Sequence, residues 1–192
     1  MFSAISILSF AFVESACSQT DTLPEFPSSK EIEPTVATSL EESNGLLRFS
    51  YSVRNGQNAA QDIWIFLVEI NVGEFVNLGP VEWRSSNIRR DTIRAASWGA
   101  LDTTVMIPPG GILHGFAISA NSIPAITNYY AVGYSEPPEG EFDYRPGSND
   151  VFYNSVKGKT IGPASFPVTF DPIVFVDTLV SYKHQAFCIG PN

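Results

Sequence analysis

The fold is decided by residues 46–69, which read LLRFSYSVRNGQNAAQDIWIFLVE. Apolar and polar side chains alternate strictly through residues 47–54, a pattern typical of a strand with one buried face and one solvated face. Asn55-Gly56 predicts a turn, and Ile63–Ile70 predicts a second, more apolar strand. We therefore expect these two strands to form the central hairpin of a β-sandwich.

The composition agrees with an all-β fold. Hydrophobic residues make up 44% of the 192 residues and aromatic residues 12%, which supplies enough apolar surface for a core. Gly and Pro number 14 each, so turns are frequent. The net charge of −9 disfavours nucleic acid and anionic membranes as partners, and its commonest meaning is solubility.

The N-terminal end predicts export. Residues 2–13 form an apolar run that is shorter than the roughly 20 residues a membrane helix needs, but it suits a signal-peptide core. Small residues follow at 15–18, as a cleavage site requires, although no Lys or Arg precedes the run. We expect residues 1–17 to be a signal peptide and the protein to be secreted or held at the cell surface. The alternative is an internal apolar segment of a truncated chain.

The two cysteines, Cys17 and Cys188, belong to no metal-binding cluster. They could form one disulfide in an oxidising compartment. Alternatively, Cys17 could be removed with the leader or lipidated, which would leave Cys188 free. Ser15-Ala16-Cys17 resembles the end of a bacterial lipoprotein signal, although Glu14 stands where that motif has an apolar residue. Only this lipidation would attach the chain to a membrane.

The remaining chain divides into three parts. Residues 18–44 are polar and turn-rich, which indicates a linker or arm with an edge strand near Thr35–Ser39. Residues 45–170 are expected to form the sandwich. Within residues 171–192, apolar residues recur at helical spacing after Pro172, which predicts a short C-terminal helix followed by a tail.

Within the sandwich, two stretches and one histidine lead to further predictions. Val81–Arg94 is rich in arginine and indicates a loop or weak strands, whereas Lys157–Thr160 resembles a hairpin turn. His114 shares the parity of Ile112 and Phe116, so it is expected on an apolar face, as a satisfied core or edge histidine.

The acidic loop Ser135–Asp150 raises the question of calcium, because carboxylates are calcium ligands. Its spacing does not match the loop DxDxDG, so a solvated acidic loop is the better interpretation. We expect no metal and no other cofactor.

Motifs of the common enzyme classes are absent from the sequence: GxSxG, HExxH, the phosphate loop and GxGxxG do not occur. The chain has two histidines, His114 and His184, and a Ser-His-Asp site would need the fold to bring its other members to one of them. We therefore expect that the protein is not an enzyme.

The chain resembles a group of exported bacterial domains with an immunoglobulin-like β-sandwich and no assigned activity. The residues that carry this resemblance are Tyr51–Phe66, Pro108–Ser119, Asn128–Tyr134 and Ser181–Phe187. The resemblance implies the sandwich architecture and brings no enzymatic motif. The Cys…Trp…Cys core of antibody domains is missing, so the likeness is architectural only.

Two functional hypotheses remain. The first is a non-catalytic extracellular or cell-surface module with a structural, adhesive or assembly role, whose strand edges could bind an unknown protein or a second copy. The second is a module that binds a carbohydrate or small ligand, which calcium could assist. The candidate ligand-binding residues are aromatic: Trp83, Trp98, Tyr129 and Tyr144, with Tyr153 beside them. Trp98 fits a core position better than a ligand platform. Aromatic rings on one open face would favour the second hypothesis, and buried rings the first.

Overall fold

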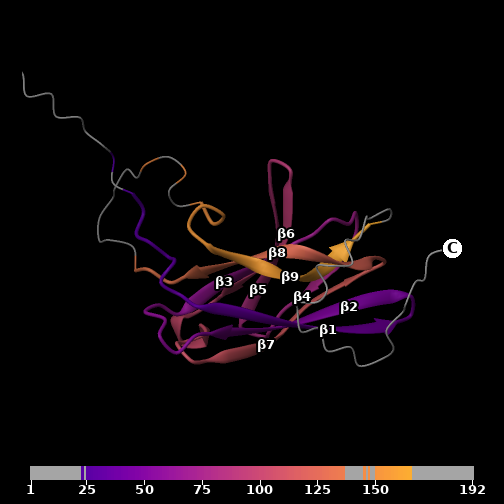
Figure 1. The fold of residues 1–192 in the computed structure, drawn as a ribbon, viewed down its shortest axis with the longest axis horizontal. Coiled ribbons are helices and arrows are strands. Elements are labelled where there is room, and N and C mark those ends of the chain that lie inside the picture. The colour runs from indigo at the N-terminus through magenta and orange to yellow at the C-terminus, as the bar shows by residue number, and fades with distance from the viewer. Residues whose placement is uncertain (1–22, 24, 137–144, 146, 148–149, 166–192) are drawn as a thin grey trace, which may run out of the picture.

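The computed structural model describes residues 23, 25–136, 145, 147 and 150–165, which fold into two antiparallel β-sheets (Figure 1). The predicted signal peptide, both cysteines, Tyr144 and the predicted C-terminal helix lie outside the described residues. The elements in chain order are β1 (Pro34–Ser43), β2 (Leu46–Asn55), β3 (Ile63–Glu69), β4 (Val76–Leu78), β5 (Trp83–Arg90), β6 (Ile93–Ala100), the 3-10 helix η1 (Thr103–Val105), β7 (Ile112–Ala120), β8 (Ile123–Gly133) and β9 (Val156–Ala164).

The prediction of an all-β sandwich is confirmed. One sheet has the strand order β1-β2-β7-β4, and the other has the order β5-β6-β3-β8-β9 (Figure 1). The first order corresponds to A-B-E-D of an immunoglobulin domain, and β3, β8 and β9 stand where strands C, F and G stand there. One difference is that β4 precedes the β5–β6 hairpin along the chain, so the chain changes sheet twice between β3 and β6. Within the described part, no helix is both long enough and apolar enough to span a membrane.

The predicted central hairpin is wrong. Strands β2 and β3 belong to different sheets, and β2 pairs instead with β1 along its whole length. Strands β1 and β2 form a hairpin whose turn is Asn44-Gly45, where φ is +54° at Asn44 and +75° at Gly45. Positive φ at both positions is what a two-residue type I′ turn requires. The edge strand expected near Thr35–Ser39 is therefore present and longer, and the sandwich begins at Pro34 within the stretch assigned to the linker.

The core lies between the sheets and is built around aromatic rings. Phe49, Tyr51 and Val53 of β2 point inward, as the alternation predicted. Phe66 of β3 stacks on Trp98 of β6 with ring centroids 5.4 Å apart and planes 14° apart. The complete burial of Tyr51 raises the pKa of its hydroxyl well above the usual value. Stacked and edge-on aromatic pairs add to the free energy gained by burial.

The predicted position of His114 on the apolar face is wrong, because a β-bulge reverses the parity of β7. The register passes from Tyr51↔Phe116 to Ser52↔His114, which leaves Gly115 unpaired. Gly115 has φ +101°, a value that favours glycine. His114 therefore lies on the exposed face, where its Nδ1 is 2.6 Å from the Ser52 hydroxyl.

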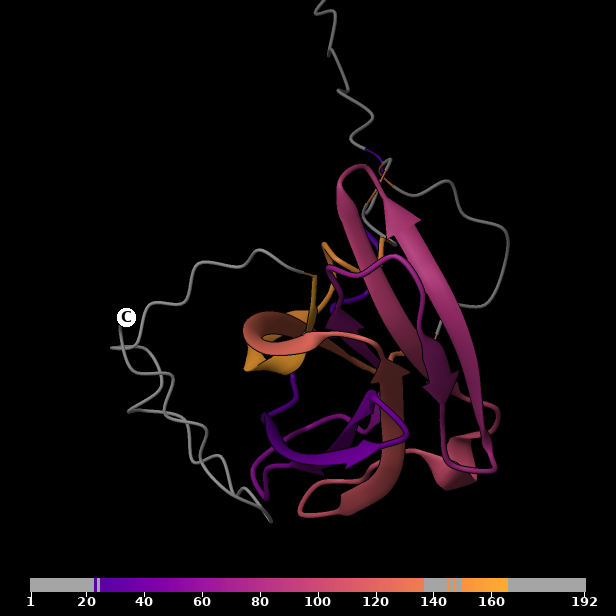
Figure 2. The same cartoon turned by 90° about the vertical axis from the view of Figure 1, so that its right-hand side faces the viewer.

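The arginine-rich stretch that sequence indicated as loop or weak strands forms the long β5–β6 hairpin. Its register runs from Trp83↔Ala100 to Arg90↔Ile93. Figure 2 shows this hairpin rising beyond the ends of the neighbouring strands. Ile88 and Tyr130, on the outer face of the sheet, pack in a second small cluster with Phe152. Burial, together with the nearby carboxylate of Glu69, raises the pKa of Tyr130 to about 12.

The predicted turn at Lys157–Thr160 is also wrong, because these residues lie within β9. Gly158 pairs with Tyr129 of β8, and a Cβ at Gly158 would collide with the Tyr129 ring. The ring crosses this position to reach the other sheet, where its hydroxyl donates to the Pro34 carbonyl at 2.9 Å. Glycine is thus required here by the close approach of a ring, and not by a turn.

Candidate functional site

Three of the four aromatic residues considered for ligand binding belong to the core. Trp83, Trp98 and Tyr129 are at most 8% exposed. The indole N–H of Trp83 donates to the Val105 carbonyl at 3.0 Å, and that of Trp98 donates to the Leu78 carbonyl at 2.8 Å. The core position expected for Trp98 is confirmed. Buried rings that also brace the backbone have no free face on which a sugar could stack.

The exposed aromatic residues of the described part do not make a flat platform either. Tyr144 lies outside the described residues, and Tyr153 is 52% exposed with the Lys30 ammonium 5.0 Å from its ring centre. Trp64 and Tyr134, which were not among the candidate ligand-binding residues, are both half-buried and in contact. Their ring planes are 78° apart, so they meet edge to face. Coplanar rings are what would have favoured carbohydrate binding.

The described end of the acidic loop has a structural role. The Asp150 carboxylate accepts hydrogen bonds from the backbone N–H groups of Phe152 and Tyr153, at 2.9 and 3.1 Å, and forms an ion pair with Arg90. Among the described residues, no group of three or more potential metal ligands occurs. Most acidic residues of this loop lie outside the described part, so the calcium hypothesis stays a hypothesis.

In the described part, Ser52 and His114 form a hydrogen-bonded serine–histidine pair, which is two of the three members of a Ser-His-Asp site. Both side chains lie on the outer face of the four-stranded sheet and are open to solvent. No hydrogen bond joins His114 to a described carboxylate, and an acid is what orients the histidine of a Ser-His-Asp site. The pair therefore bridges β2 and β7 across the bulge.

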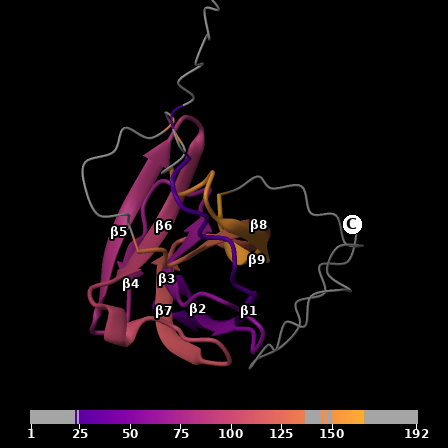
Figure 3. The same ribbon diagram turned by 90° about the vertical axis from the view of Figure 1, so that its left-hand side faces the viewer.

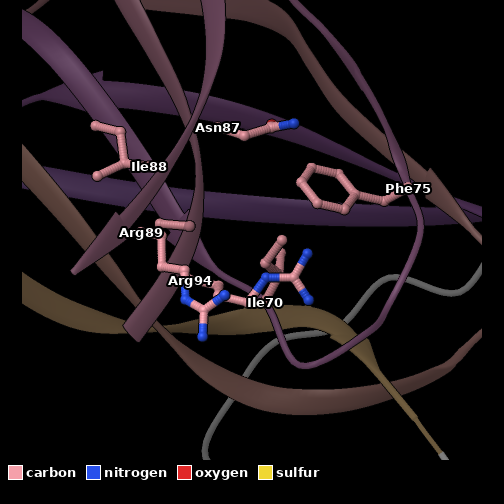
Figure 4. Close-up of a pocket in the computed structure, with 7 residues that line it drawn as sticks. Ile70, Phe75, Asn87, Ile88, Arg89 and Arg94 are labelled. Atoms are coloured by element: carbon pink, nitrogen blue, oxygen red, sulfur yellow. The ribbon is translucent and has the colours of Figure 1, made fainter. Parts of the chain in front are cut away.

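A pocket of about 350 Å³ lies between the β5–β6 hairpin and the segment before β4 (Figure 4). The residues that line it are both apolar and polar: Ile70, Phe75, Asn87, Ile88, Arg89, Arg94 and Ala95. No carboxylate is among these residues, although the whole chain carries a net charge of −9. The pocket is thus a local region of positive charge on an acidic protein.

The two arginines of the pocket lie on the face of the β5–β6 hairpin that carries Trp83 and Trp98 nearer its base, where Arg89 is exposed and Arg94 is half-buried. Arg89 has the parity of Trp83 on β5, and Arg94 has the parity of Trp98 on β6. The two residues are direct cross-strand partners. Arg94 is held in place because its guanidinium donates to the carbonyls of Val72, at 2.8 Å, and Gly73, at 3.1 Å. Sequence reasoning missed this site because the arginines were expected in an irregular region.

The edges of the two sheets form a second candidate surface, and the four edge strands differ in how they are protected. Charged side chains and proline on an edge strand oppose pairing with another chain. Strand β9 carries Lys157, Lys159 and Pro163, strand β5 carries three arginines, and β4 is only three residues long. Strand β1 is ten residues long, and its segment Thr35–Leu40 has neither charge nor proline.

Strand β1 pairs with β2 on one side and with no other described strand on its second side. Figure 3 shows β1 and β2 on the side of the molecule away from the β5–β6 hairpin. Along Thr35–Leu40 the exposed side chains are small, with Thr35, Ala37 and Ser39 in alternation, and the exposed, charged Glu41 and Glu42 follow this segment. Since no second described strand pairs with this segment, its edge can accept a further strand.

Comparisons with known proteins give little beyond the fold. No family model matches the chain, and no curated protein matches it. Among solved structures, the chain is similar to an uncharacterised protein from Nocardia farcinica described as having an immunoglobulin-like fold. That likeness has 12% sequence identity and a TM-score of 0.42, and it covers 68% of this chain and 97% of that chain. A likeness of this size concerns the fold alone.

Proposed function

We propose that the protein is a non-catalytic extracellular or cell-surface β-sandwich module with an assembly role, and that two copies join through β1. The observation that carries this proposal is the segment Thr35–Leu40 of β1, which has no charge and no proline and pairs with no second described strand, beside three edges that are charged, interrupted by proline or very short. The burial of Trp83, Trp98 and Tyr129 supports it further, because the rings are used for the core and not for a ligand face.

Two β1 strands can pair antiparallel about a two-fold axis. In such an interface the same surface of each copy contacts the other, which is the commonest arrangement of soluble homodimers. The unpaired N–H and C=O groups of one edge then meet those of the other, and the two four-stranded sheets become continuous. The segment Thr35–Leu40, at about 3.4 Å per residue, gives an uncharged edge of roughly 20 Å. The small side chains on the outer face allow the second copy to approach without a clash.

The substitution Ala37→Lys tests this interface. Ala37 is exposed in the middle of the uncharged segment, so a lysine there places two positive charges near each other in the pair. We expect the wild-type protein to dimerise in sedimentation velocity experiments. The variant is expected to associate at least about tenfold more weakly, since juxtaposed like charges across an interface cost several kcal/mol.

The matched control is Ser50→Lys, which adds the same charge to the same outer face but on the interior strand β2. We expect this variant to dimerise like the wild type. A wild-type protein that stays monomeric at about 100 μM would contradict the assembly role. Equal weakening by both substitutions would place the interface on the face of the sheet and not on its edge.

The export of the chain belongs to the same proposal and has its own test. Protein isolated from the cells that make it is expected to have an intact mass that lacks residues 1–17, because a signal peptide is removed from the mature protein. An added acyl mass on Cys17 would instead make lipid the means of surface attachment. A mass that includes residues 1–17 would contradict export.

A further inference from the structure

We propose that the pocket between the β5–β6 hairpin and the segment before β4 binds an ester of a tetrahedral oxyanion, a sulfate or phosphate ester. This inference is independent of the proposed assembly, because β1 and the β5–β6 hairpin belong to different sheets. The result of a binding experiment on this pocket does not depend on whether two copies associate through β1.

The first argument is the charge within the pocket. Arg89 and Arg94 face each other as cross-strand partners, and like charges directly opposite in a sheet are destabilising. The lining contains no carboxylate to offset them, and Glu74 of the adjoining loop is exposed and is not among the lining residues. An anion bound between the two guanidinium groups would neutralise this repulsion.

The second argument is that the donors are arranged and still available. The two carbonyl bonds of Arg94 occupy one N–H group on each terminal nitrogen, so each keeps a second N–H. The Arg89 side chain makes no hydrogen bond or ion pair with another described residue, so the five N–H groups of its guanidinium are free for a ligand. The planar fork of a guanidinium matches the spacing of two oxygens of one oxyanion.

A neutral donor and an apolar surface complete the pocket. The Asn87 carbonyl oxygen accepts a bond of 3.4 Å from the Asn77 amide, which leaves the NH₂ group of Asn87 for a ligand. Phe75 and Ile70 supply the apolar part of the lining, as Figure 4 shows. A volume of about 350 Å³ has room for the charged group together with a small organic body. The preferred ligand is therefore an ester, and not the free inorganic anion.

The test is a titration of the whole protein with phenyl phosphate and phenyl sulfate, followed through the backbone amide resonances of residues 87–95. We expect saturable shifts with one or both esters and none with phenol, which has the ring without the oxyanion. The tighter of the two esters identifies the source of the oxyanion. Arg89→Gln is expected to weaken binding at least about tenfold, because a charge-assisted bidentate contact is lost.

Arg84→Gln is the matched control, since Arg84 lies on the same strand with the opposite parity and is outside the pocket. It is expected to leave the affinity unchanged. Without ligand, Arg89→Gln should unfold at an equal or higher temperature than the wild type, because repulsion with Arg94 is removed. The inference is overturned by no binding of either ester at about 10 mM, by binding of phenol equal to that of the esters, by equal losses in both variants, or by a lower unfolding temperature of Arg89→Gln.

Discussion

Trp98→Ala is expected to lower the free energy of unfolding by about 3–5 kcal/mol, which is the range for truncating a buried tryptophan or phenylalanine. Trp98 is fully buried, stacks on Phe66 and meets Phe116 at 5.5 Å between ring centroids. Its removal leaves a cavity among rings from both sheets. It also leaves the Leu78 carbonyl without the indole N–H that now donates to it at 2.8 Å.

The change is measured by urea unfolding followed by circular dichroism. Tyr153→Ala serves as the control, because Tyr153 is exposed and its removal is expected to change stability by less than about 0.5 kcal/mol. Trp98→Phe should fall between the two, since it keeps an aromatic ring but loses the bond to Leu78. A loss below about 1 kcal/mol for Trp98→Ala would show that this ring is not the centre of the core.

The second large effect is expected from Asn55→Ala, with a loss of about 3 kcal/mol. The Asn55 side chain is completely buried and makes three hydrogen bonds to the backbone. Its oxygen accepts from the Glu33 N–H at 3.1 Å, and its amide donates to the carbonyls of Gln61 and Ile107 at 2.8 and 3.2 Å. Alanine would leave the Glu33 N–H and the Gln61 carbonyl without these bonds, whereas the Ile107 carbonyl keeps the bond from the Ile63 N–H at 2.9 Å. A polar group left without a partner when buried costs about 1–3 kcal/mol.

The same unfolding measurement checks this prediction, with Asn121→Ala as its control. Asn121 is exposed between β7 and β8, so its substitution should have little effect on stability. If both substitutions lowered the free energy of unfolding equally, the hydrogen bonds of Asn55 would add nothing to the stability of the fold.

The two Asn-Gly pairs of the chain have the same local sequence but different structures, so only part of this region could be predicted from the sequence. Alternation correctly predicted β2 and its buried face, because the period of two is a local property. The turn was assigned to Asn55-Gly56, whereas the chain reverses at Asn44-Gly45. Both pairs have the same local preference for a turn. The difference comes from the burial of Asn55, which depends on partners at residues 33, 61 and 107.

The other errors also arise from contacts between distant residues. The sequence predicted Gly158 in a turn, but this glycine lies within β9 against the Tyr129 ring. His114 was placed on the apolar face because a bulge at Gly115 cannot be seen in a period-two pattern. In each case the strand register decides the position of the side chain, and register is set by the partner strand.

The candidate sites differ in how far the sequence alone predicted them. The open strand edges were anticipated as a surface, although the choice of β1 required the strand order of both sheets. The arginine pocket could not be found, because Arg89 and Arg94 come together only when β5 and β6 pair. The core role of Trp98 was predicted from the general preference of tryptophan for packed positions.

Hydrogen exchange of the β1 amides at several protein concentrations tests assembly through β1 most directly. In a strand with one free edge, every second N–H points away from its partner strand and exchanges readily with solvent. If two copies pair through β1, those amides within Thr35–Leu40 become protected as the concentration rises, by at least about tenfold in rate, while the amides already paired with β2 change little. Rapid exchange of the same amides at every concentration, up to about 1 mM, would contradict assembly through this edge.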